Sequence, residues 1–293
     1  MREPAVAGAF YAAEPEALRR QVAGCFTHAL GPGSMPVLAR GGPRRLKALV
    51  VPHAGLSYSG PIAAHAYAAM AADGLPEAVM VVGPAHAGAP ALAALSSATA
   101  WDSPLGPLRQ HEALRAALEG GIVEVADLVH ADEHSVEVQV PFLRWLAEAA
   151  GEEVPFVPVL MGLQDETTAA ELGEALVGAA QRTGLDVVLV ASSDLMHAGP
   201  DYRIPPPRGV AVDRFAREQD ARALAAIEAL DPDGLLDVVR ARDISMCGAG
   251  PVAAVLHAAK RLGATQAKVL AHATSHDVRP HASCVGYAAV AVR

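Results

Sequence analysis

The chain has 293 residues, of which 52% are hydrophobic, 19% charged and 4% aromatic. This length and apolar content suffice for a full core, so disorder, collagen-like repeats and small disulfide scaffolds are excluded. With 23 Lys and Arg against 32 Asp and Glu, the net charge is −9, which gives nucleic-acid binding no electrostatic support. No Ser/Gly/Pro-rich linker divides the chain, and we expect one domain over residues 1–293.

The compartment and the relation to membranes can also be predicted. Glu3, Glu14 and Glu16 and the lack of an apolar segment argue against a secretory signal, and three cysteines suit reduced thiols, so we expect a cytoplasmic protein. Residues 48–72 and 78–101 carry no charge, but Pro and Gly interrupt both stretches. They are therefore interpreted as buried strands and helices, with no membrane span.

Short apolar, often β-branched runs predict buried strands, and longer amphipathic segments between them predict helices. Strands are expected at 46–51, 78–82, 91–96, 122–125, 154–161, 186–191, 267–271 and 285–292. Helices are expected at 15–30, 62–72, 110–118, 134–149, 165–182, 213–230, 232–240 and 251–262, and a proline-rich loop at 199–210. The pattern indicates an α/β fold with a central, mostly buried mixed sheet flanked by helices.

Titratable side chains follow the carboxyl ends of three expected strands. His53 follows 46–51, His86 follows 78–82, and both Asp194 and His197 follow 186–191. Ligands of open α/β sheets bind at that edge, and a right-handed crossover would place His53 and His86 on the same side. A lone histidine is more often structural, but three such positions favour a site, and neutral imidazole is the commonest metal ligand.

Cys247 lies just before the helix expected from Pro251. Backbone N–H groups and the helix dipole would stabilise a thiolate at such a position. The alternative is a small buried apolar residue, and that interpretation is favoured for Cys25 and Cys284, which fall within a helix and a strand.

The segment 132–139 predicts the start of a helix with acidic residues in its first turn. One interpretation is a solvated, well-capped helix N-terminus. The other is a supporting role beside the site for Glu133, His134 and Glu137. His134 and Glu137 are three apart on the expected helix, and the face that they share continues into apolar residues.

These motifs together resemble the Memo family. The residues that carry the resemblance are 51–55, 83–86, 132–143, 192–197, 246–248 and 285–289, which span nearly the whole chain. Bacterial and archaeal members are often called AmmeMemoRadiSam system protein B, and the resemblance implies an AMMECR1-like protein and a radical-SAM protein as partners. It also implies a fold similar to the class III, LigB-type extradiol dioxygenases, which cleave catechol-like rings with non-haem Fe(II).

Motif by motif, the resemblance implies that His53, His86 and Cys247 are metal-site residues, with Asp194 and His197 beside them. The dioxygenase relatives use two histidines and a carboxylate, whereas the third position here is Cys247. A thiolate is softer, shifts metal preference towards copper or zinc, and is itself oxidisable. The expected cofactor is Fe(II), with copper and then zinc as alternatives.

Three functions are consistent with these residues. The first is a metal-dependent, dioxygenase-like redox enzyme for a small molecule, in which His197 is the general acid/base and Asp194 orients it. The second is a peptide- or protein-binding module that uses the former catalytic pocket. The third is a hydrolase or transferase with Cys247 as nucleophile. A homodimer is also consistent with the Ala-rich composition.

Overall fold

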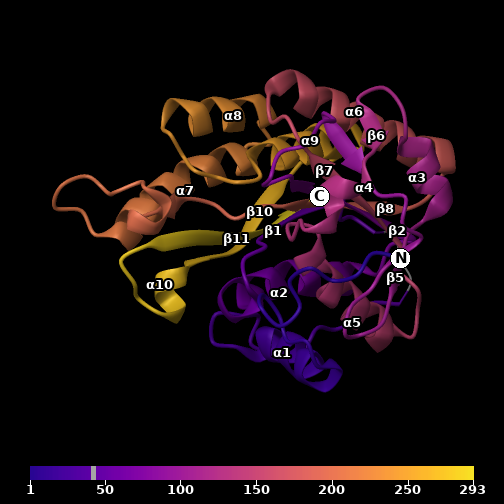
Figure 1. Ribbon diagram of the computed structural model, residues 1–293, viewed down its shortest axis with the longest axis horizontal. Helices are drawn as coiled ribbons and strands as arrows, with labels where there is room; N and C mark the ends of the chain where they lie inside the picture. Colours follow the sequence, from indigo (N-terminus) through magenta and orange to yellow (C-terminus); the bar gives the residue numbers. More distant parts are fainter. Residues whose placement is uncertain (41–43) are drawn as a thin grey trace.

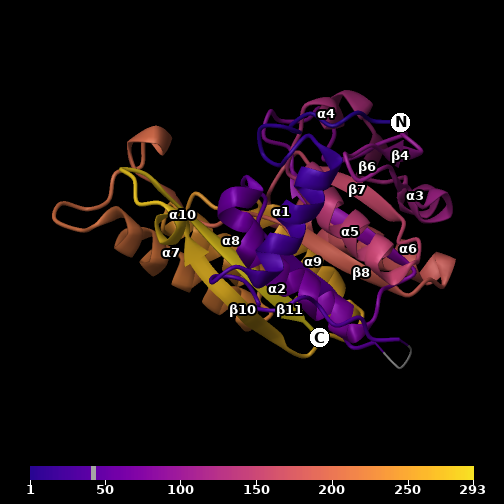
Figure 2. The same ribbon diagram turned by 90° about the horizontal axis from the view of Figure 1, so that it is seen from below.

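A mixed β-sheet forms the centre of the molecule (Figures 1 and 2). The computed structural model describes residues 1–40 and 44–293. The strands of the main sheet are β1 (Ala48–Val51), β2 (Ala78–Pro84), β3 (Ala93–Leu95), β6 (Val123–Val125), β7 (Phe156–Met161), β8 (Val187–Ser192), β9 (His197–Ala198), β10 (Ala267–Thr274) and β11 (Cys284–Val292). Their order is β10-β11-β1-β8-β2-β7-β3-β6, and β9 pairs with β11. The predicted α/β class is confirmed.

The inner strands of this sheet run parallel. β1 and β2 both pair with β8 in parallel, and β2 pairs in the same way with β7. β11 runs antiparallel to β1, and β3 antiparallel to β7. The carboxyl ends of β1, β2 and β8 therefore meet at one edge of the sheet, where the loops that follow them can form a site.

Helices cover both faces of the sheet and bury two separate apolar cores. One face is covered by α1 (Pro15–Thr27), α2 (Leu56–Asp73) and α5 (Val140–Ala150), which lie together at the bottom of Figure 1. The other face is covered by α3 (Glu112–Leu118), α6 (Glu166–Thr183), α7 (Val212–Glu228), α8 (Pro232–Ala241) and α9 (Ala249–Arg261). Alternate residues of β1 supply the two cores: Val50 faces the second group of helices, and Leu49 faces the first.

α2 differs from its predicted form because it begins at Leu56 and continues through Pro61. The expectation that Gly60 and Pro61 interrupt this stretch is therefore wrong. A Cβ on Gly60 would lie 2.5 Å from the sulfur of Cys25, so glycine allows α1 and α2 to pack closely here. None of the described helices is long and apolar enough to cross a membrane.

Most of the other differences between the predicted and the observed secondary structure are short elements. The pair β4 (Ala100–Trp101) and β5 (Leu108–Arg109), the helices α4 (Asp127–Ala131) and α10 (Ser275–Val278), and β9 were not predicted. The expected loop at 199–210 contains one 3₁₀ turn, Pro200–Tyr202. The expected helix 134–149 begins as a 3₁₀ turn, Glu137–Gln139, and continues as α5, so His134 precedes it.

Candidate metal centre

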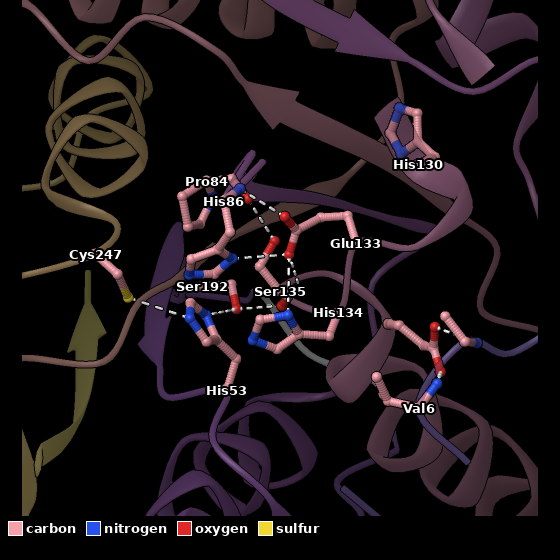
Figure 3. A network of polar contacts seen from close by, with 12 residues as sticks. Val6, His53, Pro84, His86, His130, Glu133, His134, Ser135, Ser192 and Cys247 are labelled. Carbon is pink, nitrogen blue, oxygen red and sulfur yellow. Dashed lines mark hydrogen bonds and ion pairs between the residues drawn. The ribbon is translucent and has the colours of Figure 1, made fainter. Parts of the chain in front are cut away.

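Three histidines converge at the carboxyl edge of the sheet (Figure 3). His53 follows β1, His86 follows β2, and His134 lies in the loop before the 3₁₀ turn. One ring nitrogen from each lies within 4.8 Å of the other two. His53 is buried, while the side chains of His86 and His134 are 36% and 23% exposed, so the group is open to solvent on one side.

The outer nitrogen of each ring is held by a protein oxygen. Glu133 Oε1 lies 2.9 Å from His86 Nδ1 and 3.3 Å from His134 Nδ1, and Ser192 Oγ lies 3.0 Å from His53 Nδ1. Within residues 1–40 and 44–293, Nε2 of His86 and Nε2 of His134 have no hydrogen-bonding partner. This is the arrangement that fixes ring orientation in metal-binding histidines.

The hydrogen bonds of Ser192 determine the tautomer of His53. The Ser192 hydroxyl has one proton, which it donates to the Ser135 carbonyl at 2.6 Å. It therefore accepts from Gln139 Nε2 at 2.9 Å and from His53 Nδ1. His53 Nε2 consequently carries the lone pair that a metal needs.

The surroundings keep the rings of His53 and His134 neutral and the nearby carboxylate charged. Burial lowers the pKa of His53, and the neighbouring His134 and His86 lower it further. Burial also lowers the pKa of His134. Burial alone would raise the pKa of Glu133, but hydrogen bonds from His86 and from the Ser135 amide lower it to about 2. Neutral imidazoles next to a carboxylate are the ionisation states that suit a divalent cation.

Cys247 borders this group without belonging to the set of three. Its sulfur lies 3.1 Å from His53 Nε2 and accepts the Asp194 amide N–H at 3.3 Å. Burial, followed by the negative charge of Asp194, raises the pKa of the Cys247 thiol. Of the two interpretations of Cys247, the structure therefore favours a buried thiol over a free thiolate, because burial outweighs the helix dipole. Cys25 and Cys284 are buried, as expected.

Asp194 and His197 lie beside the centre, but in different roles from those expected. Asp194 Oδ1 accepts the backbone N–H of His53 at 2.8 Å and that of Ala54 at 3.3 Å, so it holds the loop that carries His53. Among the described residues no hydrogen bond joins Asp194 to His197, so the prediction that Asp194 orients His197 is left with only their electrostatic attraction. His197 Nδ1 lies 3.0 Å from the carbonyl oxygens of both Leu195 and Ser245. Because carbonyls only accept, Nδ1 carries the proton, and Nε2 is the basic atom of the neutral ring.

A family model described as Memo-like protein matches residues 2–291.

The chain belongs to the Memo family.

It is 40% identical to a MEMO1 family protein of Methanopyrus kandleri over 100% of this chain and 99% of the relative. A MEMO1 family protein of Ignicoccus hospitalis is 42% identical over 99% and 98% of the two chains. The solved structure of an uncharacterized protein from Escherichia coli K12 is 16% identical, with a TM-score of 0.56 over 85% of this chain and 100% of that one. The last likeness shows the fold alone.

Glu137 of this Memo family protein faces away from the three histidines. Its carboxylate accepts hydrogen bonds from Arg2 Nη1 at 2.7 Å, from the amides of Ala5 and Val6 at 2.9 and 3.0 Å, and from the Tyr11 hydroxyl at 2.6 Å. The shared helix face predicted for His134 and Glu137 does not form, because the helix starts only at Glu137. Glu137 instead anchors the first residues of the chain.

Arg2 is the residue beside the site that sequence reasoning missed. It is 7% exposed, and its guanidinium also donates to the carbonyls of His130 at 2.7 Å and Glu133 at 2.8 Å. It lies 4.1 Å from the ring centroid of Trp101. Arg2 therefore ties the N-terminal segment to the loop that carries Glu133 and His134. A single arginine so far away in sequence gives no local signal.

Proposed function

We propose that this Memo family protein is a metal-dependent redox enzyme that acts on a small molecule with Fe(II), in the manner of non-haem dioxygenases. Copper and then zinc are the alternative metals. The observation that supports the proposal is the group of three ring nitrogens within 4.8 Å of one another, whose outer nitrogens are held by Glu133 and Ser192.

Four side chains would hold the metal. His53, His86 and His134 supply nitrogen, and Cys247 supplies sulfur, because its Sγ is close enough to His53 Nε2 for both atoms to contact one ion. Imidazole and thiolate ligands suit iron, copper and zinc, and metal binding would remove the thiol proton that burial otherwise retains. An iron ion bound here would supply the redox chemistry with O2.

The remaining polar residues would prepare the site for a substrate. Glu133 holds His86 and His134 in one orientation, and Asp194 holds the backbone at His53. His197, whose proton is fixed on Nδ1 by two carbonyls, would take up a substrate proton at Nε2. Its ring packs at 4.9 Å against Tyr202, which limits its rotation.

The test is metal content after anaerobic purification, measured by mass spectrometry for wild type and single variants. We expect about one equivalent of metal in wild type and its loss in His53→Ala and His86→Ala. His134→Ala and Cys247→Ala should each bind more weakly. The controls are His281→Ala, an exposed histidine, and Cys25→Ala, a buried thiol of α1 that packs against α2. Equal metal content in site variants and controls would refute the proposal.

A loaded protein would then be tested for O2 uptake. Uptake that depends on an added catechol or thiol and disappears in His197→Gln would support the redox function. Full metal loading without uptake in the presence of either compound would contradict it.

A further inference from the structure

A cavity of about 590 Å³ opens directly beside the three-histidine centre. His86 and His134 form part of its wall, together with Glu133. The volume lies in the range of small-molecule sites, which are about 300–1,000 Å³. A ligand in this cavity would therefore contact the rings of the proposed centre.

The charge on the cavity wall has one sign. Its described lining includes Asp127, Asp132 and Glu133 but no lysine or arginine. Asp127 is bound to Ser97, and Glu133 to the two histidines. Asp132 is exposed and has no side-chain partner among the described residues, so its charge faces whatever enters.

Arg2, which binds the backbone at His130 and Glu133, does not offset these charges. Arg2 donates to the backbone carbonyls of His130 and Glu133 and forms an ion pair with the buried Glu137 at 2.7 Å. It is absent from the cavity wall. Its charge is therefore matched by Glu137, and in the metal-free protein the carboxylates of the wall determine the local potential.

The rest of the wall is apolar and made of small side chains. It consists of Ala85, Ala87, Gly88, Pro90, Ala126, Leu128 and Val129. Leu128 is 92% exposed and lies in α4 at the cavity. This wall can cover the apolar body of a ligand, and the small residues leave room for a ring.

A second cavity, of about 350 Å³, has a wall of mixed charge. It is lined by Arg279, His281 and Asp201, but by none of the three histidines of the centre. His281 Nδ1 lies 3.7 Å from the Asp201 carboxylate. This cavity thus has an arginine in its wall, whereas the described wall of the cavity beside the centre has none.

We propose that the 590 Å³ cavity is the substrate chamber and that it selects by charge. Through the carboxylates of its wall it takes an uncharged or cationic molecule with an apolar body, and it disfavours anions. This inference rests on the proposed function.

Three probes share one ring and one pair of hydroxyls and differ in charge: dopamine is a cation, catechol is neutral and 3,4-dihydroxybenzoate is an anion. Their affinities would be measured anaerobically by calorimetry for the metal-free protein and for protein incubated with Fe(II). We expect dopamine to bind most tightly and dihydroxybenzoate about tenfold more weakly than catechol, because nearby charges at the protein surface interact by about 1 kcal/mol or more.

Two variants test whether this order of probe affinities depends on the residues of the cavity wall. Asp132→Lys should narrow or reverse the difference between dopamine and dihydroxybenzoate, whereas Glu124→Gln, an exposed carboxylate outside the cavity wall, should leave it unchanged. Ala87→Trp should weaken all three probes, because the exposed Ala87 lines the cavity and a large ring there would fill it. Circular dichroism would verify that the variants are folded.

The outcomes separate the inference from the proposed function. A protein that binds no iron refutes the metal-dependent function, while the order of affinities in the metal-free protein still decides the charge selection. Equal affinities for the three probes, tighter binding of the anion, no binding to either form, or no effect of Ala87→Trp would overturn the inference.

Discussion

Two segments border the three-histidine centre, and the protein holds them in different ways. Residues 130–137 are held by charge, through the buried ion pair between Arg2 and Glu137. Residues 192–197 have no partner arginine or lysine within residues 1–40 and 44–293. Asp194 and Asp220 are buried carboxylates that accept backbone N–H groups.

The difference appears in the ionisation of the two segments. Hydrogen bonds lower the pKa of Glu133 to about 2, whereas burial raises the pKa of Asp194 and that of Asp220. Carboxylates beside one site thus have opposite pKa shifts. The hydrogen bonds that Glu133 accepts from the His86 ring, the His86 amide and the Ser135 amide outweigh its burial, whereas burial outweighs the hydrogen bonds that Asp194 and Asp220 accept. We therefore expect the first segment to control metal binding and the second to contribute mainly to the fold around it.

The largest effect is expected from Arg2→Met, which removes the cation from the first segment. Glu137 is 1% exposed and would keep a buried charge without a cationic partner. The free energy of unfolding should fall by about 3–5 kcal/mol, measured by urea denaturation. The double variant Arg2→Met/Glu137→Gln should recover part of the loss. A decrease below about 1 kcal/mol would show that the ion pair does not hold this segment.

The next largest effect is a loss of stability at low pH that arises from His130, which also lies in the first segment. Burial lowers the pKa of His130 from 6.5 to about 4, and Arg2 contributes in the same direction against the hydrogen bond to the Ala94 carbonyl. The unfolded chain binds this proton more readily, so stability is lost as the pH falls from 6.5 to 4, by about 3 kcal/mol in total.

Urea denaturation at pH 7 and pH 4 would measure this loss. His130→Gln keeps a donor for the Ala94 carbonyl but has no titrating ring. It should lose about 3 kcal/mol less stability than wild type over the same pH range. If the two proteins lose the same free energy of unfolding between pH 7 and pH 4, His130 does not contribute to the loss of stability in acid.

A smaller change is expected from Glu133→Gln, which keeps the size of the side chain and removes its charge. A single amide oxygen cannot orient both His86 and His134 as the carboxylate does. Metal affinity should fall about 10–100-fold, measured by competition with a chelator. Glu124→Gln is the matched control. Unchanged metal affinity in Glu133→Gln would contradict the expectation that the first segment controls metal binding.

The smallest effect is expected from Asp220→Asn in the support of the second segment. Asp220 Oδ1 accepts the Met196 amide at 2.8 Å, and asparagine can retain that hydrogen bond while losing the contact of Oδ2 with His272 Nε2, also 2.8 Å. Stability should fall by about 1 kcal/mol, with metal affinity unchanged. A loss of metal comparable to that of Glu133→Gln would show that both segments control the centre.

Much of the fold could be predicted because apolar runs mark the buried strands. The runs at 46–51, 78–82 and 186–191 correspond to β1, β2 and β8, and the rule that ligands bind at the carboxyl ends of strands placed His53 and His86 at the same edge. Elements such as β9 and α4 are too short to produce a periodic pattern.

The candidate site could be predicted only in part. His134 was expected to support the site from a helix, but the helix begins at Glu137 and leaves His134 free to join His53 and His86. The sequence shows which residues are polar, but the acceptor of each hydrogen bond depends on the folded backbone. Asp194 therefore was expected to contact His197, although it binds the backbone at His53.

The position of β1 in the sheet has a consequence for the newly made chain. β1 is the first strand in sequence, yet it lies between β8 and β11, so both of its edges are paired only after β11 has left the ribosome. At about 5–20 residues per second, the chain between β1 and β11 takes about 10–50 s to synthesise. Cys247 is the last of the four proposed donors to emerge. The centre is therefore assembled late in synthesis, and a nascent chain presents only isolated histidines to the metals around it.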